Sequence, residues 1–154
     1  MARWRLALSL VAAATVSAAC APATPEGVDT AVLDREIGQA IGDPSTCVLV
    51  AERASGKIVY RYGSNTVCAR SYPACQEQPA RTVDDLLASL GSTAAAVTTS
   101  CPTAPDGSRS VGWAAGPVTG RDLVFAAVME GPRALPGMIM ADRLAGAFAD
   151  AGME

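Results

Sequence analysis

Two β-hairpin patterns, one in each half of the chain, constrain its fold most strongly. Residues 47–53 and 57–62 are rich in β-forming residues, and Ser55-Gly56 between them is typical of a tight turn. Residues 110–115 and 123–129 repeat this arrangement in the last third of the chain. We therefore expect at least four antiparallel strands.

A predicted helix lies at each end of this β-rich region. In residues 28–41 and again in 138–151, apolar side chains recur at the spacing of one helix face. Packing both helices on one face of a sheet would bury their apolar sides together with those of the hairpins. The sequence thus predicts an α+β fold: an antiparallel sheet of four or five strands flanked by N- and C-terminal helices, with Trp113 and Phe125 in its core.

The middle of the chain gives weaker signals. Residues 64–81 show no regular pattern, and residues 83–90 form a short predicted helix whose start is marked by Thr82 and Asp85 as a capping box. Asp84 and Asp85 fit a solvated helix start, favoured by the helix dipole, better than a general-acid pair. Residues 94–99 are a candidate fifth strand.

The start of the chain resembles a secretory signal. Two arginines precede the apolar run 6–16, and small residues at 17–19 lead to Cys20. This pattern resembles the lipobox of a bacterial lipoprotein, in which the cysteine becomes the lipidated first residue; the alternative is ordinary cleavage that leaves Cys20 a plain thiol. We expect a signal peptide at 1–19, a tether at 20–27 and a single domain at 28–154, exported to the periplasm or cell envelope and lipid-anchored to the membrane through Cys20.

Four further cysteines bear on this compartment. Cys47, Cys68, Cys75 and Cys101 could form up to two disulfides in an oxidising environment, with three possible pairings. A zinc site fits less well, because the spacings are not C-x-x-C and the chain has no histidine. No metal or cofactor is predicted.

The charged residues limit both the partners and the chemistry. The net charge is −3, and the basic residues are scattered rather than gathered in a stripe, so nucleic acid is not an expected partner. Lys57 is the only lysine and lies in the first hairpin turn. With no histidine and one lysine, the chain has few groups for acid/base catalysis at neutral pH.

Two blocks of sequence resemble the class D, oxacillinase-type, serine β-lactamases, which belong with the penicillin-binding proteins. The first block is 47–75, with Ser55-Gly56-Lys57 and Tyr72-Pro73-Ala74-Cys75; the second starts at Asp106-Gly107 and runs through Trp113 to Glu130-Gly131-Pro132 and the last helix. The resemblance implies a five-stranded antiparallel sheet between N- and C-terminal helices. The family's helical lobe is expected to be mostly missing, because only about 25 residues separate Cys75 from Cys101.

The catalytic motifs of that family do not match. Its Ser-x-x-Lys motif should fall near 73–79, where Cys75 stands for the serine and Gln78 for the lysine, or Gln76 for the serine and Pro79 for the lysine. Its Lys-Thr-Gly motif, which holds the substrate carboxylate, falls on Thr98-Thr99-Ser100. Both alignments lose the base, so the resemblance predicts a protein without hydrolytic activity.

Three functional hypotheses follow. The first is an inactive β-lactamase-like protein that retains affinity for a β-lactam or a peptidoglycan-like ligand. The second is a non-enzymatic envelope lipoprotein that acts as a binding module through the sheet face left without its lobe, with self-association as one mode. The third is the poorly folding product of a damaged gene, in which residues 76–103 replaced the lobe.

Overall fold

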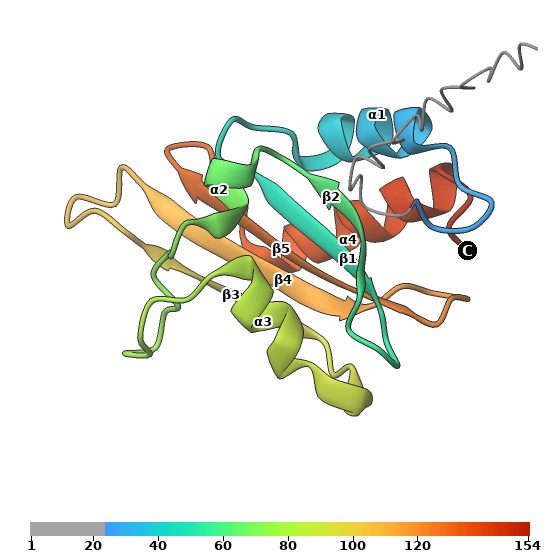
Figure 1. Ribbon diagram of the computed structural model, residues 1–154. Helices are drawn as coiled ribbons and strands as arrows, with labels where there is room; N and C mark the ends of the chain where they lie inside the picture. The colour runs from blue at the N-terminus through green and yellow to red at the C-terminus, as the bar shows by residue number, and fades with distance from the viewer. Residues whose placement is uncertain (1–23) are drawn as a thin grey trace, which may run out of the picture.

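The computed structural model describes residues 24–154, except for the side chain of Ser92. The predicted signal peptide, the first tether residues and Cys20 lie outside the described residues. Within them, the chain runs as helix, hairpin, a mixed middle segment, hairpin and helix, the order predicted from the sequence (Figure 1).

One five-stranded sheet forms the centre of the domain. Its strands are β1 (Cys47–Glu52), β2 (Ile58–Tyr62), β3 (Val97–Pro102), β4 (Ser110–Pro117) and β5 (Leu123–Gly131). They lie in the order β2-β1-β5-β4-β3, and every neighbouring pair is antiparallel. The predicted α+β class with an antiparallel sheet is confirmed.

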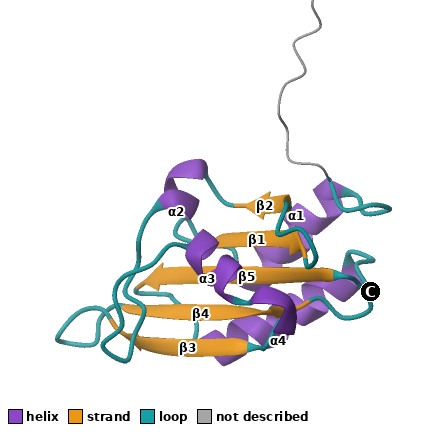
Figure 2. Ribbon diagram, turned by 60° about the horizontal axis from the view of Figure 1, so that its bottom comes forward, coloured by secondary structure: helices purple, strands orange, loops and turns teal. Residues whose placement is uncertain are grey.

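Helices cover both faces of this sheet (Figure 2). The terminal helices α1 (Thr30–Ile41) and α4 (Gly137–Asp150) pack against each other on one face. The short helices α2 (Asn65–Ala69) and α3 (Val83–Ser89) lie on the other, which we call the α3 face. Because both faces are covered, β1, β4 and β5 are buried nearly continuously instead of alternating with exposed residues.

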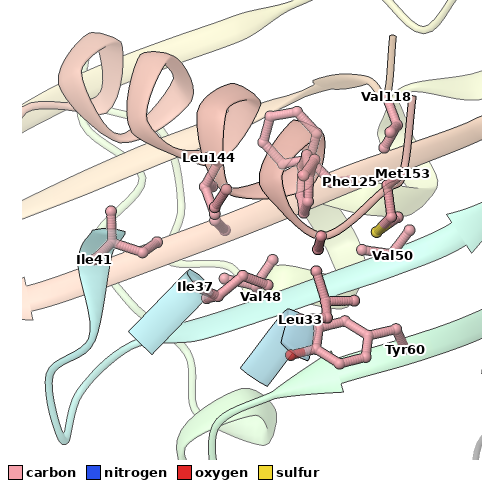
Figure 3. Close-up of a cluster of buried hydrophobic side chains, with 14 of the residues drawn as sticks. Leu33, Ile37, Ile41, Val48, Val50, Tyr60, Val118, Phe125, Leu144 and Met153 are labelled. Atoms are coloured by element: carbon pink, nitrogen blue, oxygen red, sulfur yellow. The ribbon is translucent and has the colours of Figure 1, made fainter. Parts of the chain in front are cut away.

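The core between the sheet and the terminal helices is mainly apolar. Leu33 and Ile37 of α1 and Leu144 of α4 are each 0 % exposed, and they pack toward Val48 and Val50 of β1 (Figure 3). α1 begins where the Asp29 carboxylate accepts a hydrogen bond from the backbone N–H of Ala31 at 2.8 Å, which satisfies one of the free donors of the first turn.

A second apolar cluster lies on the α3 face. Leu49 of β1 and Trp113 of β4 are buried there against Val83 and Leu86 of α3. The predicted capping box starts α3: the Thr82 hydroxyl accepts from the backbone N–H of Asp85, whose carboxylate accepts from the backbone N–H of Thr82.

Two details of the middle segment differ from the sequence-based expectation. Residues 64–81 are not wholly irregular, because the Ser64 hydroxyl accepts from the Val67 N–H and so starts α2. The weak strand expected at 94–99 is instead β3, Val97–Pro102, since Ala94 has left-handed backbone that interrupts an extended segment. Pairing along the whole edge of β4, and not side-chain composition, determines where β3 lies.

Candidate functional site

The segment between α2 and α3 forms a closed loop beside β3 and β4 (Figure 1). At its base, the backbone of Tyr72 pairs with that of Arg81 through two hydrogen bonds of 2.9 and 3.0 Å. The intervening residues 73–80, called the 73–80 loop below, contain the positions where the resemblance places the nucleophile and its base. The described structure therefore holds the candidate catalytic positions on a loop and not on a helix.

The cysteine at the candidate nucleophile position is not a thiol. Cys75 forms a disulfide with Cys101 of β3, with their Cα atoms 5.7 Å apart. The other disulfide joins Cys47 of β1 to Cys68 of α2. Of the three pairings that the sequence left open, the structure has this one, and it leaves none of these four sulfurs free for nucleophilic attack or metal binding.

The disulfide brings together the two segments that the resemblance assigns to one site. Cys101 directly follows Thr98-Thr99-Ser100, so the 73–80 loop is attached to the strand where Lys-Thr-Gly would stand. Gln78 and Pro79, at the candidate lysine positions, are exposed. An amide and a proline ring take up no proton near neutral pH, so neither could serve as the base.

Trp113 lies beneath this loop and fixes its position. The indole N–H donates to the Pro73 carbonyl at 2.8 Å, and the Tyr72 ring meets the indole edge-on with 6.1 Å between ring centroids. The Arg81 guanidinium lies over the indole, 5.0 Å from its centroid. Burial lowers the pKa of Arg81, and the Asp85 carboxylate opposes that shift. Trp113 is thus a buried structural anchor, as its place on an apolar strand predicted.

Thr99, the one residue retained from Lys-Thr-Gly, pairs directly with Trp113 across the β3–β4 ladder. Its hydroxyl oxygen is buried and has no hydrogen-bond partner among the described residues. An oxygen closed off from solvent contacts no ligand in this conformation. The retained threonine is therefore not in position to bind a substrate carboxylate.

Lys57 lies far from the loop. The strand registers put the β1–β2 turn, which contains Lys57, at one end of the sheet and Cys101 at the other. The lysine side chain is exposed, and its backbone N–H donates to the Ser55 hydroxyl at 3.2 Å. The only lysine of the chain is therefore a turn residue here and lies outside the candidate site.

An ion cluster that sequence reasoning missed lies near Cys101. Glu130, at the end of β5, accepts hydrogen bonds from Arg109, Arg70 and Thr103. Burial alone would raise the pKa of Glu130, but the hydrogen bonds from Arg109 and Thr103 and the charges of both arginines hold it below its ordinary value. Its four members come from three segments, the end of α2, the β3–β4 connection and β5, and no local sequence signal groups them.

Two adjoining cavities form a groove on the α3 face, which we call the α3 groove. One, of about 550 Å³, lies between the β1–β2 turn, α3 and the start of β5; the other, of about 540 Å³, lies between β1, β2, α2 and the start of α3. Asp84 lines both. Leu49, Ile58 and Leu87 give the groove an apolar floor, while exposed charged groups line its rim.

Within residues 24–154, no group of three His, Cys, Asp or Glu side chains is placed to hold a metal ion. No helix in the same range has both the length and the apolar character needed to cross a bilayer.

Comparison with known proteins adds no relative. No protein-family model, curated protein or solved structure matches this chain. The likeness to class D β-lactamases therefore remains a prediction from the sequence.

Proposed function

We propose that this chain is an exported, class D β-lactamase-like domain that binds a β-lactam or peptidoglycan-like ligand without hydrolysing it. The observation that carries the proposal is the Cys75–Cys101 disulfide. It joins the segment at the nucleophile position to the strand at the Lys-Thr-Gly position, which supports a common origin of the site. It also removes the thiol, which supports the loss of activity.

The lack of a base supports the same conclusion. A serine or cysteine nucleophile needs a proton acceptor within about 2.6–3.2 Å, or a lowered pKa. Cys75 is bonded to sulfur, and the candidate base positions hold Gln78 and Pro79. The Thr99 hydroxyl is buried away from any substrate. We therefore assign the domain a binding role and no acyl-transfer chemistry.

Export is part of this proposal. Disulfides persist in oxidising compartments and are rare in the cytosol, so the two disulfides support a location outside it. A signal peptide at 1–19 and a lipid on Cys20 would attach the domain to the cell envelope, with residues 21–27 as a spacer.

Incubation with β-lactams tests the proposal directly. Purified protein beginning at residue 20 is mixed with a chromogenic cephalosporin and, separately, with a fluorescent penicillin. We expect no turnover and no covalent label above a heat-denatured control, but saturable, reversible binding of the fluorescent penicillin that an unlabelled penicillin displaces. Turnover or a covalent adduct would overturn the inactivity, and the absence of displaceable binding would overturn the ligand class.

Reduced protein provides the sharpest control. Reduction with a phosphine releases the Cys75 thiol at the candidate nucleophile position without supplying a base. We expect the reduced protein to remain unlabelled by the fluorescent penicillin. Labelling that appears only on reduction and disappears in Cys75→Ser would show that the disulfide, rather than the missing base, had suppressed a latent nucleophile.

The α3 groove favours a second candidate function, a binding module that self-associates. Its floor is apolar, with Ile58 partly exposed and Leu49 and Leu87 buried, and an apolar centre with a polar rim is typical of protein interfaces. Light scattering after gel filtration tests it, and a dimer is expected. A strictly monomeric protein that binds no hydrophobic dye would exclude the module.

A further inference from the structure

The 73–80 loop contains the most unusual backbone of the described chain. Three consecutive residues, Cys75, Gln76 and Glu77, have φ angles of 67°, 51° and 60°. This left-handed conformation brings Cβ too close to the following carbonyl oxygen, so it is unfavourable for every residue except glycine and is tolerated singly by asparagine or aspartate. None of the three is such a residue. Strain of this kind persists only where surrounding contacts enforce it.

The contacts that enforce it act on two separate parts of the loop. The base is closed by the backbone pairing of Tyr72 with Arg81 and by the hydrogen bond from Trp113 to the Pro73 carbonyl. The strained part is attached to the sheet by the Cys75–Cys101 disulfide. Gln76 and Glu77 are exposed and donate or accept no side-chain hydrogen bond among the described contacts. The backbone N–H of Gln78 donates to the Cys75 carbonyl at 3.0 Å and closes a turn over the strained residues, and the disulfide attaches that turn to the sheet.

The two disulfides differ in their surroundings. They span similar lengths of chain, 21 and 26 residues, so the entropy of loop closure contributes nearly equally to both. Cys47 is 0 % exposed and lies within a central strand, whereas Cys101 lies on the edge strand β3 and is partly exposed. Of the two disulfides, Cys75–Cys101 thus combines a partly exposed cysteine with strained backbone next to it.

We propose that Cys75–Cys101 is a thiol–disulfide exchange site for a dithiol reductant. If the chain is exported as proposed above, this reductant is a dithiol oxidoreductase of the cell envelope. A thiolate of the dithiol attacks the Cys101 sulfur, the Cys75–Cys101 bond breaks, and Cys75 leaves as a thiolate that takes up a proton. The second thiolate of the dithiol then attacks the reductant's sulfur in the mixed disulfide, and Cys101 leaves as a thiolate. Two electrons pass from the dithiol to the pair, and the dithiol becomes a disulfide.

Reduction changes only the loop. The Tyr72–Arg81 pairing and the Trp113–Pro73 hydrogen bond contain no sulfur and remain, so the domain keeps its fold. Once Cys75 is released from β3, residues 75–77 can return to right-handed backbone with the loss of one turn hydrogen bond, from Gln78 to the Cys75 carbonyl, and the loop separates from β3. The free energy released by this relaxation favours the reduced state and makes Cys75–Cys101 the more easily reduced of the two disulfides.

Redox titration tests the inference. The chain carrying Cys20→Ser, so that no fifth cysteine exchanges, is equilibrated in buffers of reduced and oxidised dithiothreitol. Free thiols are alkylated, and mass spectrometry of the peptides reports each disulfide separately. We expect Cys75–Cys101 to be reduced first, with the far-UV circular dichroism unchanged at that point. Reduction of Cys47–Cys68 first, or loss of secondary structure together with Cys75–Cys101, would overturn the proposal.

A pair of glycine variants separates strain from accessibility. Gln76→Gly/Glu77→Gly removes the penalty for left-handed backbone, so the Cys75–Cys101 pair should become about tenfold harder to reduce, while Cys47–Cys68 is unchanged. Gln78→Gly adds flexibility just outside the left-handed run and should leave the equilibrium unchanged or make reduction slightly easier. Equal behaviour of the two variants would show that reduction does not release the strain, and the proposed coupling would be wrong.

Discussion

Replacing Glu130 with glutamine should reduce stability through one identifiable cluster. The Glu130 side chain is 11 % exposed, and Arg109 donates to it three times, at 3.2, 3.0 and 2.8 Å. Arg70 donates at 3.2 Å and Thr103 at 3.1 Å. The glutamine variant keeps the size and one acceptor oxygen, but it places an NH₂ group opposite guanidinium donors and removes the negative charge.

The size of the loss follows from the exposure of the partners. The arginine side chains are 52 % and 49 % exposed, so each ion pair contributes no more than about 1 kcal/mol after solvent screening. Leaving donors without an acceptor in a mostly buried position costs about 1 kcal/mol more. We therefore expect Glu130→Gln to lower the free energy of unfolding by about 2 kcal/mol at pH 7.

The loss should depend on pH in a defined direction. The pKa of Glu130 in the folded protein lies below its ordinary value. The carboxylate therefore contributes stability above the unfolded-state pKa of about 4.3, and that contribution declines as the pH falls through the lower folded pKa. The difference between wild type and Glu130→Gln should be complete at pH 7 and decrease steadily below about pH 4.

Urea unfolding measures both effects. Circular dichroism with both disulfides intact gives the free energy of unfolding at pH 7 and pH 3 for wild type and variant. Asp122→Asn is the matched control, because Asp122 is 77 % exposed and forms a single 3.5 Å ion pair with Arg53; it should change stability by less than about 0.5 kcal/mol. A Glu130→Gln protein as stable as wild type at pH 7, or equally destabilised at both pH values, would refute the reasoning.

Two further predictions concern the helix cap and the close approach of α4 to the sheet. Thr82→Ala removes the side-chain acceptor at the start of α3 and should cost about 1 kcal/mol in urea unfolding, whereas Thr119→Ala, at an exposed turn, should cost nearly nothing; equal effects would show that the cap does not matter. Gly112→Ala places a Cβ against the carbonyl oxygen of Leu135, so we expect a loss of more than about 3 kcal/mol. Gly146 lies on α4, and a Cβ added there meets no atom within 4 Å, so the higher helix propensity of alanine in Gly146→Ala should stabilise the domain by about 1 kcal/mol. Thermal unfolding compares the two glycine variants.

The parts of the fold that the sequence predicted are those with strong local signals. Apolar side chains at helical spacing mark α1 and α4, the Thr82 capping box marks the start of α3, and alternating or continuous apolar runs mark the two hairpins. The sequence predicts β3 three residues too early, because the alanines before it and its own threonines and serine give a weak local signal and its position depends on pairing with β4. Long-range pairing of this kind has no local signature.

The candidate site was predicted in part for the same reason. The four cysteines indicated disulfides, but their pairing depends on which strand lies beside the 73–80 loop. Nothing in Cys75-Gln76-Glu77 predicts left-handed backbone, because residues with that preference are absent from the run. The Glu130 cluster joins arginines 39 residues apart in the sequence, at positions 70 and 109, and only the folded chain brings them together.

The arrangement of the disulfides also determines how the domain responds to proteases. The two covalent loops, 47–68 and 75–101, follow one another without overlapping. A single peptide-bond cut within either loop, for example at the exposed residues 76–80, leaves both fragments covalently joined. A cut between 68 and 75 separates the chain into two pieces held only by the shared sheet. The domain can therefore be nicked across most of its middle third and still remain one covalent molecule.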